Sequence, residues 1–240
     1  MNSRIAACHV HSEWSYDASW TLAELVLSFK SQGCSLLLMT EHDKDWDQER
    51  WRRYEQACAA ASTEGMLVVP GIEYSDPSNT VHVLVWGVSE FLGEGLETGD
   101  LLKKVAQFNG VAVLAHPDRR EAWRRFEMNW VPDILGVEVW NRKTDGWSAS
   151  ENGIRLWKQT GVAPFAGLDF HRKNQFYPLR MEVEVSHDAG CEEVFEALRA
   201  GRISPRFRGR DLRQMLHVGS GILRPALEKL RRVLRAVSPH

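Results

Sequence analysis

The feature that most limits the fold of this chain is a regular alternation of short apolar, β-rich runs with longer segments of helical period. Seven runs are expected to form strands, and they lie at residues 5–11, 35–40, 66–74, 111–116, 136–140, 163–170 and 181–186. Six segments of helical period lie at residues 21–32, 47–63, 100–108, 118–126, 148–160 and 192–200. Strand–helix alternation of this kind predicts an α/β fold with a parallel sheet covered by helices.

Periodicity alone leaves two architectures open, a closed β/α barrel and an open doubly wound sheet. No glycine-rich phosphate-binding pattern follows the first predicted strand, so nothing marks a nucleotide site of the doubly wound type. A further apolar run at residues 81–88 follows the turn Asp76-Pro77-Ser78-Asn79. We interpret this run as either a hairpin return or an additional strand.

The composition is that of an ordinary globular protein, with 43% hydrophobic and 26% charged residues in 240. No apolar stretch is long enough for a transmembrane helix, and the first residues lack the apolar core of a secretion signal. A cytoplasmic protein is therefore expected. The four cysteines form no C-x-x-C pair, and Cys8 is expected to be a small core residue rather than a thiolate ligand.

The histidines are not scattered at random along this pattern. Six of the nine lie at or just beyond predicted strand ends, namely His9, His11, His42, His82, His116 and His171. Carboxylates accompany them at Asp17, Glu73 and Asp169, with Glu41, Asp43 and Glu138 nearby. In a β/α barrel the C-terminal ends of the strands share one face, so these side chains would converge there.

The chemistry of this set indicates a metal site. His9-x-His11 and Asp169-x-His171 each place two ligands on the same side of an extended segment. Imidazole and carboxylate donors without thiolates suit zinc, manganese or iron, and Glu73 has two oxygens with which to bridge two ions. A single buried histidine is more often a core residue than a ligand, but nine residues at matching points of successive strand–helix units favour metal binding.

Read in chain order, these segments resemble the polymerase and histidinol phosphatase (PHP) family of metal-dependent phosphoesterases. The segments that carry the resemblance are Cys8-His9-Val10-His11-Ser12, Tyr16-Asp17, Thr40-Glu41-His42-Asp43, Pro70-Gly71-Ile72-Glu73, His82-Val83-Leu84, Ala115-His116-Pro117 and Gly167-Leu168-Asp169-Phe170-His171. The resemblance implies a distorted (β/α)7 TIM-like barrel over residues 1–203.

The resemblance also implies two to three divalent metal ions at one centre. By position, the first ion would be bound by His9, His11, Glu73 and Asp169. Glu73 would bridge to a second ion, bound also by His82 and His116. The third would be bound by Asp17, His42 and His171. Asp17 stands where many family members have histidine.

The activity expected from such a centre is hydrolysis of a phosphate ester by a hydroxide that bridges two ions. The substrate would be a small phosphorylated molecule or a nucleotide. Arg119, Arg142 and Arg172 are candidates for binding its phosphate, the alternative for each being a solvated surface charge. Asp43 or Asp118 is a candidate for protonating the leaving group.

Three other functions compete with this one. An amidohydrolase also uses histidines and a bridging ligand, but no lysine stands at a predicted strand end to be carbamylated as the bridge. A nuclease acting on nucleotide or oligonucleotide ends would share the same centre. A catalytically silent, metal-stabilised binding module would be expected to show broken ligand sets.

Residues 204–240 are predicted to form a separate basic extension. Residues 1–201 carry 20 basic and 30 acidic groups, whereas residues 202–240 carry 10 and 2. An amphipathic helix is expected within the extension, with an apolar face listed as Ile222, Leu223, Ala226, Leu227, Leu230, Val233, Leu234 and Val237. This face would pack on the barrel or on a second copy of the chain as a homo-oligomer; an anionic membrane or nucleic acid is the alternative partner.

Overall fold

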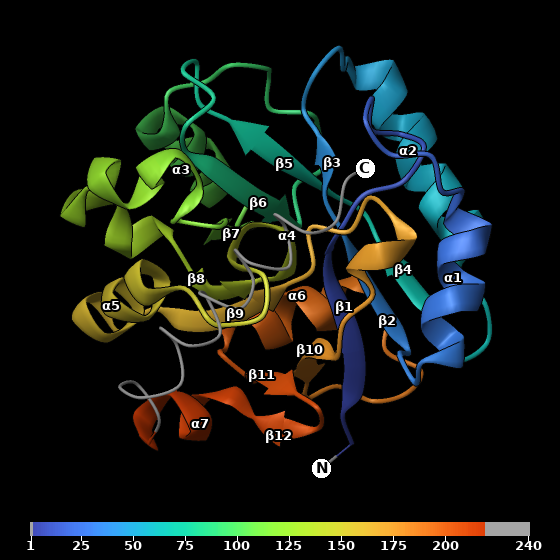
Figure 1. Ribbon diagram of the computed structural model, residues 1–240. Coiled ribbons are helices and arrows are strands. Elements are labelled where there is room, and N and C mark those ends of the chain that lie inside the picture. Colours follow the sequence, from blue (N-terminus) through green and yellow to red (C-terminus); the bar gives the residue numbers. More distant parts are fainter. Residues whose placement is uncertain (1, 219–240) are drawn as a thin grey trace, which may run out of the picture.

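Two six-stranded sheets form the centre of the molecule, and the helices lie outside them (Figure 1). The computed structural model describes residues 2–218 of the chain. The first sheet has the order β12-β11-β10-β1-β2-β4. Its strands are β1 (Arg4–Val10), β2 (Leu36–Met39), β4 (Leu67–Val69), β10 (Leu179–Val183), β11 (Ile203–Phe207) and β12 (Arg210–Asp211). The second has the order β3-β5-β6-β7-β8-β9. Its strands are β3 (Glu41–His42), β5 (Gly71–Ser75), β6 (His82–Trp86), β7 (Val111–Leu114), β8 (Gly136–Asn141) and β9 (Ala163–Gly167).

The two sheets join along two lines to form a barrel-like ring. On one side β2 continues into β3 across Thr40, and β4 continues into β5 across Pro70. On the other side the chain beyond β9 lies against β1, where the Leu168 amide donates to the Cys8 carbonyl over 2.9 Å and the Phe170 amide to the His9 carbonyl over 3.0 Å. Seven strand positions thus surround the interior, as the (β/α)7 expectation requires.

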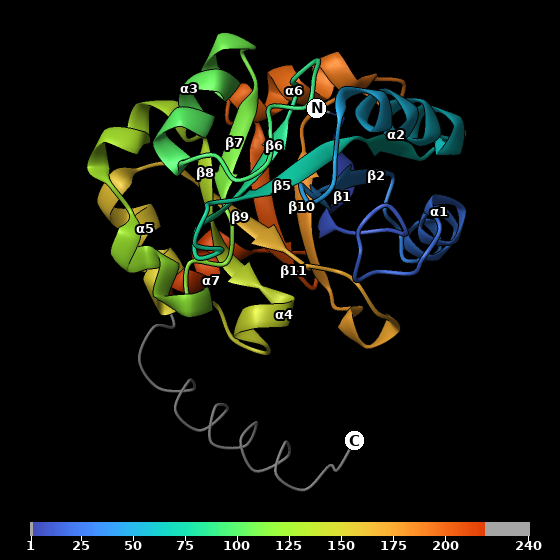
Figure 2. The ribbon, with the colours of Figure 1, turned by 90° about the horizontal axis from the view of Figure 1, so that it is seen from above.

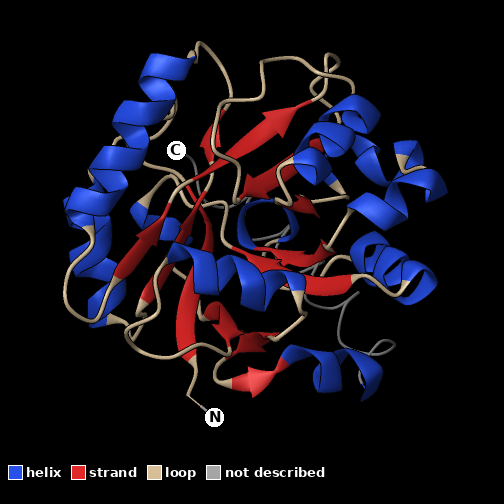
Figure 3. Ribbon diagram, turned by 180° about the vertical axis from the view of Figure 1, so that it is seen from behind, coloured by secondary structure: helices blue, strands red, loops and turns tan. Residues whose placement is uncertain are grey.

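The helices surround this ring, as the view from above and the view from behind both show (Figures 2 and 3). They are α1 (Leu22–Ser31), α2 (Gln48–Ala61), α3 (Thr98–Gln107), α4 (Arg142–Asp145), α5 (Glu151–Thr160), α6 (Cys191–Arg199) and α7 (Leu212–Val218). Local chemistry explains where several begin. Thr21 and Glu24 form a reciprocal capping box at α1, and the side chains of Asp47 and Ser150 cap α2 and α5.

The parallel pattern breaks at β6 and again at β10, beyond which β11 and β12 also pair antiparallel. β6 runs antiparallel to both β5 and β7, so the run at residues 81–88 is a hairpin return after the predicted turn. β10, expected as the seventh parallel strand, pairs antiparallel with β1. The barrel is therefore distorted, and the reversed direction of β6 places its first residue, His82, at the end where the parallel strands finish.

The predicted helix at residues 118–126 is wrong. The segment forms a kinked 3-10 helix, η1 (Arg119–Arg125), in which Arg120 and Glu121 have φ of 48° and 56°. An α-helix cannot contain two consecutive left-handed residues. Two further short 3-10 helices, η2 (Met128–Asp133) and η3 (Lys173–Gln175), were not expected from the sequence.

The predicted division at residue 203 falls at the start of β11, which pairs with β10 and extends the first sheet. Most of the predicted extension, including the amphipathic helix expected around residues 222–237, lies outside the described residues. Both the division at residue 203 and the helix therefore stay predictions. Among residues 2–218, no helix has the length and apolar character needed to cross a membrane. Cys8 is a buried core residue, as expected.

Candidate metal centre

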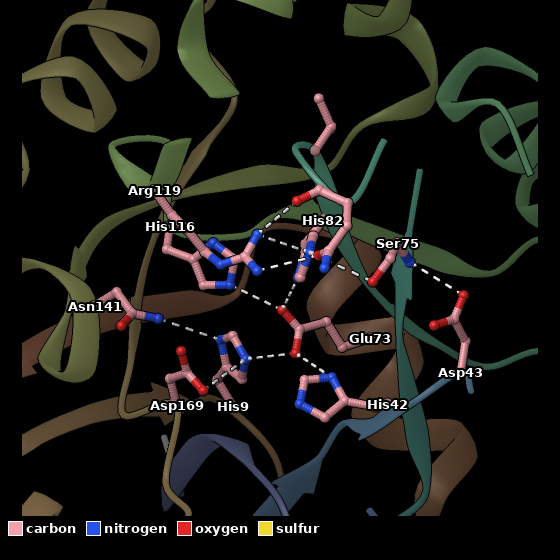
Figure 4. Close-up of polar contacts among 12 residues, drawn as sticks. His9, His42, Asp43, Glu73, Ser75, His82, His116, Arg119, Asn141 and Asp169 are labelled. Atoms are coloured by element: carbon pink, nitrogen blue, oxygen red, sulfur yellow. Dashed lines mark hydrogen bonds and ion pairs between the residues drawn. The ribbon is translucent and has the colours of Figure 1, made fainter. Parts of the chain in front are cut away.

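All nine predicted ligands come together at one end of the ring, the end at which the parallel strands finish. Figure 4 shows six of them, namely His9, His42, Glu73, His82, His116 and Asp169. β1 and the residue after it carry His9 and His11, β3 carries His42, and β5 carries Glu73. Because β6 runs in the reverse direction, its first residue, His82, lies at this same end. The others follow strands or lie in a loop, namely His116 after β7, Asp169 and His171 after β9, and Asp17 between β1 and α1.

Glu73 is the centre of the cluster, and its two oxygens face different histidines. Oε1 lies 2.7 Å from His82 Nδ1 and 2.8 Å from His116 Nε2. Oε2 lies 3.4 Å from both His9 Nε2 and His11 Nε2, and 3.2 Å from His42 Nδ1. A carboxylate that faces a separate group of imidazoles with each oxygen has the arrangement of a bridging ligand.

Two further carboxylates complete the set on the open side. Asp169 Oδ1 lies 3.6 Å from His11 Nε2 and 3.3 Å from His171 Nδ1. Asp17 faces the rim histidines, with Oδ1 3.3 Å from His42 Nε2 and Oδ2 3.2 Å from His171 Nε2. The structure therefore brings Asp17, His42 and His171 together as one group at the mouth of the site.

His9 is oriented by a second, wholly buried carboxylate. Its Nδ1 lies 2.8 Å from Glu138 Oε1, so the ring donates a proton there and turns Nε2 towards Glu73 and Asp169. Glu138 Oε2 accepts the backbone N–H of His116 over 2.7 Å and the Asn141 amide over 2.8 Å. The packing is close, since a Cβ added to Gly167 would lie 1.7 Å from Glu138 Oε1.

His11 is oriented in the same way through a serine. Ser15 Oγ donates to Glu41 Oε2 over 2.5 Å and accepts the backbone N–H of His42 over 3.0 Å. Its single hydrogen is thus engaged, so His11 Nδ1, 3.2 Å away, must carry the proton. The Nε2 of His11 is left as a lone pair. Glu41 and Glu138, named from the sequence only as neighbours, both hold histidines of the cluster.

The backbone is strained at three of the ligands. His9, His116 and Asp169 have φ of 60°, 23° and 50°, a region that residues other than glycine rarely occupy. At His9 the strand pairing with β2 shifts between Cys8 and Val10. His9 and His11 do converge, but through this kink rather than through the straight extended segment that their spacing predicts. Strain of this kind clusters at functional sites.

The electrostatics keep the carboxylates ionised. Burial would raise the pKa of Glu73, but the imidazoles of His9 and His82 hold it well below its ordinary value. Burial likewise opposes ionisation of Asp169, whose pKa is lowered to about 2 by His9 and Lys143. Burial, with His171 and His42 nearby, holds the pKa of His11 well below its ordinary value, so that ring is neutral. Burial opposes protonation of His9 and His42, but Glu138 raises the pKa of His9 well above its ordinary value, and Asp17 with Glu73 raises that of His42 to about 10. Metals bind ionised carboxylates and neutral imidazoles, so an ion bound here would displace a proton from these two rings.

The residues present fit divalent metal ions. Among the described residues, His9 Nε2, His11 Nε2 and Glu73 Oε2 are buried and have no hydrogen-bond partner, although they point at one another. Buried polar atoms without partners are rare in folded proteins, and a cation between them would satisfy all three. Three groups have donor atoms close enough to share an ion, namely His11 with His42 and His171, His9 with Glu73 and His116, and His9 with His11 and Asp169.

A cavity of about 280 Å³ opens over this cluster. Of the three arginines predicted to bind phosphate, Arg119 lines it, with its guanidinium 3.0 Å from His82 Nε2 and donating to the Asn79 carbonyl. Arg142 instead lies over the ring of Tyr177, and Arg172 is an exposed residue outside the cavity lining.

The two candidate acids are also placed differently. Asp43 lines the cavity, and burial raises its pKa to about 6. Asp118 does not line the cavity. Its carboxylate instead accepts hydrogen bonds from Ser150 Oγ over 2.6 Å and from the Asn152 amide.

Lys143 is a residue of the site that the sequence did not identify. It lies in α4, two residues beyond the end of β8, and its Nζ is 3.0 Å from Asp169 Oδ1. The prediction that no lysine lies at a strand end is therefore wrong, because Lys143 lies two residues after β8. The missed signal was the short segment after Asn141, where the strand passes directly into a helical turn.

No family model matches the sequence, and no match was found among curated proteins. Solved structures do match. A two-domain protein of Bacteroides vulgatus that contains a predicted PHP-like metal-dependent phosphoesterase is 16% identical, with a TM-score of 0.64, over 86% of this chain and 65% of that one. A lesion-specific endonuclease of Pyrococcus furiosus is 15% identical, with a TM-score of 0.59, over 83% and 56%. An amidohydrolase of Chromobacterium violaceum with bound sulfate is 16% identical, with a TM-score of 0.53, over 71% and 88%.

These likenesses establish the fold. The chain has the architecture of the PHP-like metal-dependent phosphoesterases, which is the architecture that the ordered motifs predict. It spans less than two thirds of the length of the Bacteroides and Pyrococcus proteins.

Proposed function

We propose that this protein is a metal-dependent phosphoesterase that hydrolyses a small phosphorylated substrate or a nucleotide. The observation that carries the proposal is Glu73, a buried carboxylate whose two oxygens face separate groups of histidines. That arrangement suits two cations held side by side, which can stabilise both the attacking and the leaving oxygen at a phosphoryl group.

Nine residues would hold two to three divalent ions, of zinc, manganese or iron. The first would be bound by His9, His11, Glu73 and Asp169, the second by Glu73, His82 and His116, and the third by Asp17, His42 and His171. Such ions would activate water near neutral pH and neutralise charge on the phosphoryl oxygens. The donors are imidazoles and carboxylates throughout, which supports these metals over ions that prefer thiolates.

The protein's own groups would bind and orient the substrate. Arg119 presents a guanidinium to the cavity beside His82, where it would bind a phosphate oxygen. Asp43 lies in the cavity wall with a raised pKa, which suits a group that donates a proton to the leaving oxygen. The guanidinium of Arg119 in the cavity lining supports binding of a phosphate over binding of a neutral substrate.

Amide hydrolysis is the alternative activity. Lys143 reaches the cluster, but its Nζ contacts Asp169 and His171, whereas the central position between the histidines belongs to Glu73. A carbamylated lysine bridge would have to occupy the place that Glu73 already fills.

The test is a substrate screen on the full chain loaded in turn with manganese, zinc or magnesium. We expect phosphate release from phosphomonoesters or nucleotides, abolished by chelator and restored by metal. Elemental analysis should give two to three metal equivalents per chain. Hydrolysis of amides or lactones without any phosphoester turnover would establish the alternative, and less than about half a metal equivalent after loading would overturn the metal centre.

A further inference from the structure

Lys143 brings a positive charge directly to the metal-ligand cluster. Its Nζ lies 3.0 Å from Asp169 Oδ1 and 3.4 Å from each ring nitrogen of His171. The side chain is 40% exposed, and it lines the same cavity as Arg119. Lys143 is therefore in contact both with the ligand set and with the space that a substrate would enter.

The position of Lys143 is fixed by the same groups that orient the ligands. Asn141 caps α4, because its Oδ1 accepts the backbone N–H of Thr144 over 3.0 Å. The other end of the same amide donates to Glu138 Oε2, the carboxylate that holds His9. Hydrogen bonds through Asn141 thus join the start of α4 to the buried carboxylate of Glu138. These bonds fix the backbone of α4, which carries Lys143, next to the cluster.

Arg119 and Lys143 approach the cluster from opposite sides of Glu73. Arg119 lies beside His82, on the Oε1 side (Figure 4). Lys143 lies beside Asp169 and His171, which belong to the side reached by His11. A group that lies over Glu73 in the cavity would therefore have one organic cation on each side.

An ammonium group in this place needs an anion. Asp169 is its ionised partner, but Asp169 is also a proposed metal ligand, and coordination would neutralise much of its charge. Lys143 would then stand beside cations in a half-buried site, which is unfavourable unless a further anion lies between them. A phosphoryl group over the cluster has both the charge and the spare oxygens to fill that role.

We infer that Lys143 is a substrate-binding residue whose ammonium binds a phosphoryl oxygen on the wall opposite Arg119. The inference rests on the proposed function, which it deepens by assigning a second cation to the phosphate group. It also explains why a lysine persists beside the ligands without occupying the bridging position of Glu73.

The experiment compares three variants of the full, metal-loaded chain: Lys143→Met, Lys143→Arg and the control Lys158→Met on the exposed face of α5. Elemental analysis gives metal content, and calorimetry gives the Kd for inorganic phosphate. Steady-state kinetics gives KM and kcat for the best phosphomonoester. Loss of a charged hydrogen bond should raise the phosphate Kd and the KM by about tenfold or more in Lys143→Met, with metal content unchanged. Lys143→Arg should keep most of the binding, and Lys158→Met should match the wild type.

Two results would overturn the inference. An unchanged Kd and KM in Lys143→Met would show that the ammonium does not touch phosphate. Loss of metal in Lys143→Met would show instead that the lysine holds Asp169 in place. The proposed function fails separately: wild-type protein that binds phosphate but hydrolyses no ester contradicts that function alone, and the Kd comparison still decides the role of Lys143. Wild-type protein that binds no phosphate contradicts the Lys143 inference itself.

Discussion

The two ends of the ligand cluster are built differently. Around Glu73, the ligands His9, His11 and His116 are almost wholly buried, and two of them are held by further buried carboxylates, Glu138 and Glu41. At the mouth, Asp17 comes from a loop and its side chain is 35% exposed. It contacts His42 and His171, whose other ring nitrogens face Glu73 and Asp169, which are themselves proposed ligands rather than supporting carboxylates.

The difference in burial indicates that the two ends of the cluster bind ions in different ways. Buried ligands with fixed ring orientation lose little freedom when they bind an ion, so the Glu73 end is preorganised. The exposed Asp17 end is adjustable, and an ion there should exchange more readily with solvent. We therefore expect the buried end to set activity and the rim to modulate it.

The largest effect is expected from Glu73→Ala. It removes an oxygen from both groups of histidines and leaves any two ions to repel each other without a bridge. Turnover should fall by a factor on the order of 10³ or more. Metal content should drop to about one equivalent or less, because only the group of Asp17, His42 and His171 is left complete. Elemental analysis and phosphoester turnover check this, and a variant that kept full metal and near-normal turnover would contradict the assignment of the centre.

A smaller effect is expected from Glu138→Gln, because Glu138 is buried behind His9 and does not line the cavity. The neutral amide orients His9 less strongly, so metal affinity and activity should each fall by about 10- to 100-fold. Metal titration followed by fluorescence, together with turnover at saturating metal, separates weaker binding from slower chemistry. Glu192→Gln on exposed α6 is the control, and equal behaviour of the two variants would show that Glu138 does not orient the ligand.

Asp17→Ala tests the other end of the comparison. Because Asp17 contacts His42 and His171 alone among the proposed ligands, about two metal equivalents should remain, and turnover should fall by only about tenfold. Asp17→His should restore the third equivalent, since an imidazole can replace the carboxylate as a donor. If Asp17→Ala proved as damaging as Glu73→Ala, the proposed division between buried and exposed ends would be wrong.

The smallest effect is expected from removal of residues 219–240. All nine proposed ligands precede this segment, so metal content and turnover should match those of the full chain. Oligomeric state, measured by light scattering, is the property that we expect to change if the predicted amphipathic helix joins two copies. Loss of metal on truncation would show that the ring depends on this segment.

The positions of the proposed ligands could be predicted because each is a histidine or a carboxylate, and all but Asp17 lie in a strand or just beyond its end. Asp17, in the loop between β1 and α1, is assigned through the family resemblance. The supporting groups could not. Glu41 and Glu138 read as ordinary carboxylates until the fold places them behind His11 and His9. Lys143 depends on the helical turn that Asn141 caps, a feature too short to show periodicity. Arg142 follows the same strand end, yet its guanidinium lies over Tyr177, because neighbouring residues of a turn point in different directions.

The left-handed backbone at His9, His116 and Asp169 has a consequence for how this protein can change. Glycine or asparagine would relieve the conformational strain at such positions, and substitution there would remove the imidazole or the carboxylate charge that the centre needs. Selection for stability alone would therefore erode the centre at its own ligands, and variants that have lost the chemistry should be recognisable by glycine or asparagine at these three places. An imidazole or carboxylate retained in this disfavoured backbone conformation would therefore distinguish a functional metal centre from one that has lost its metals.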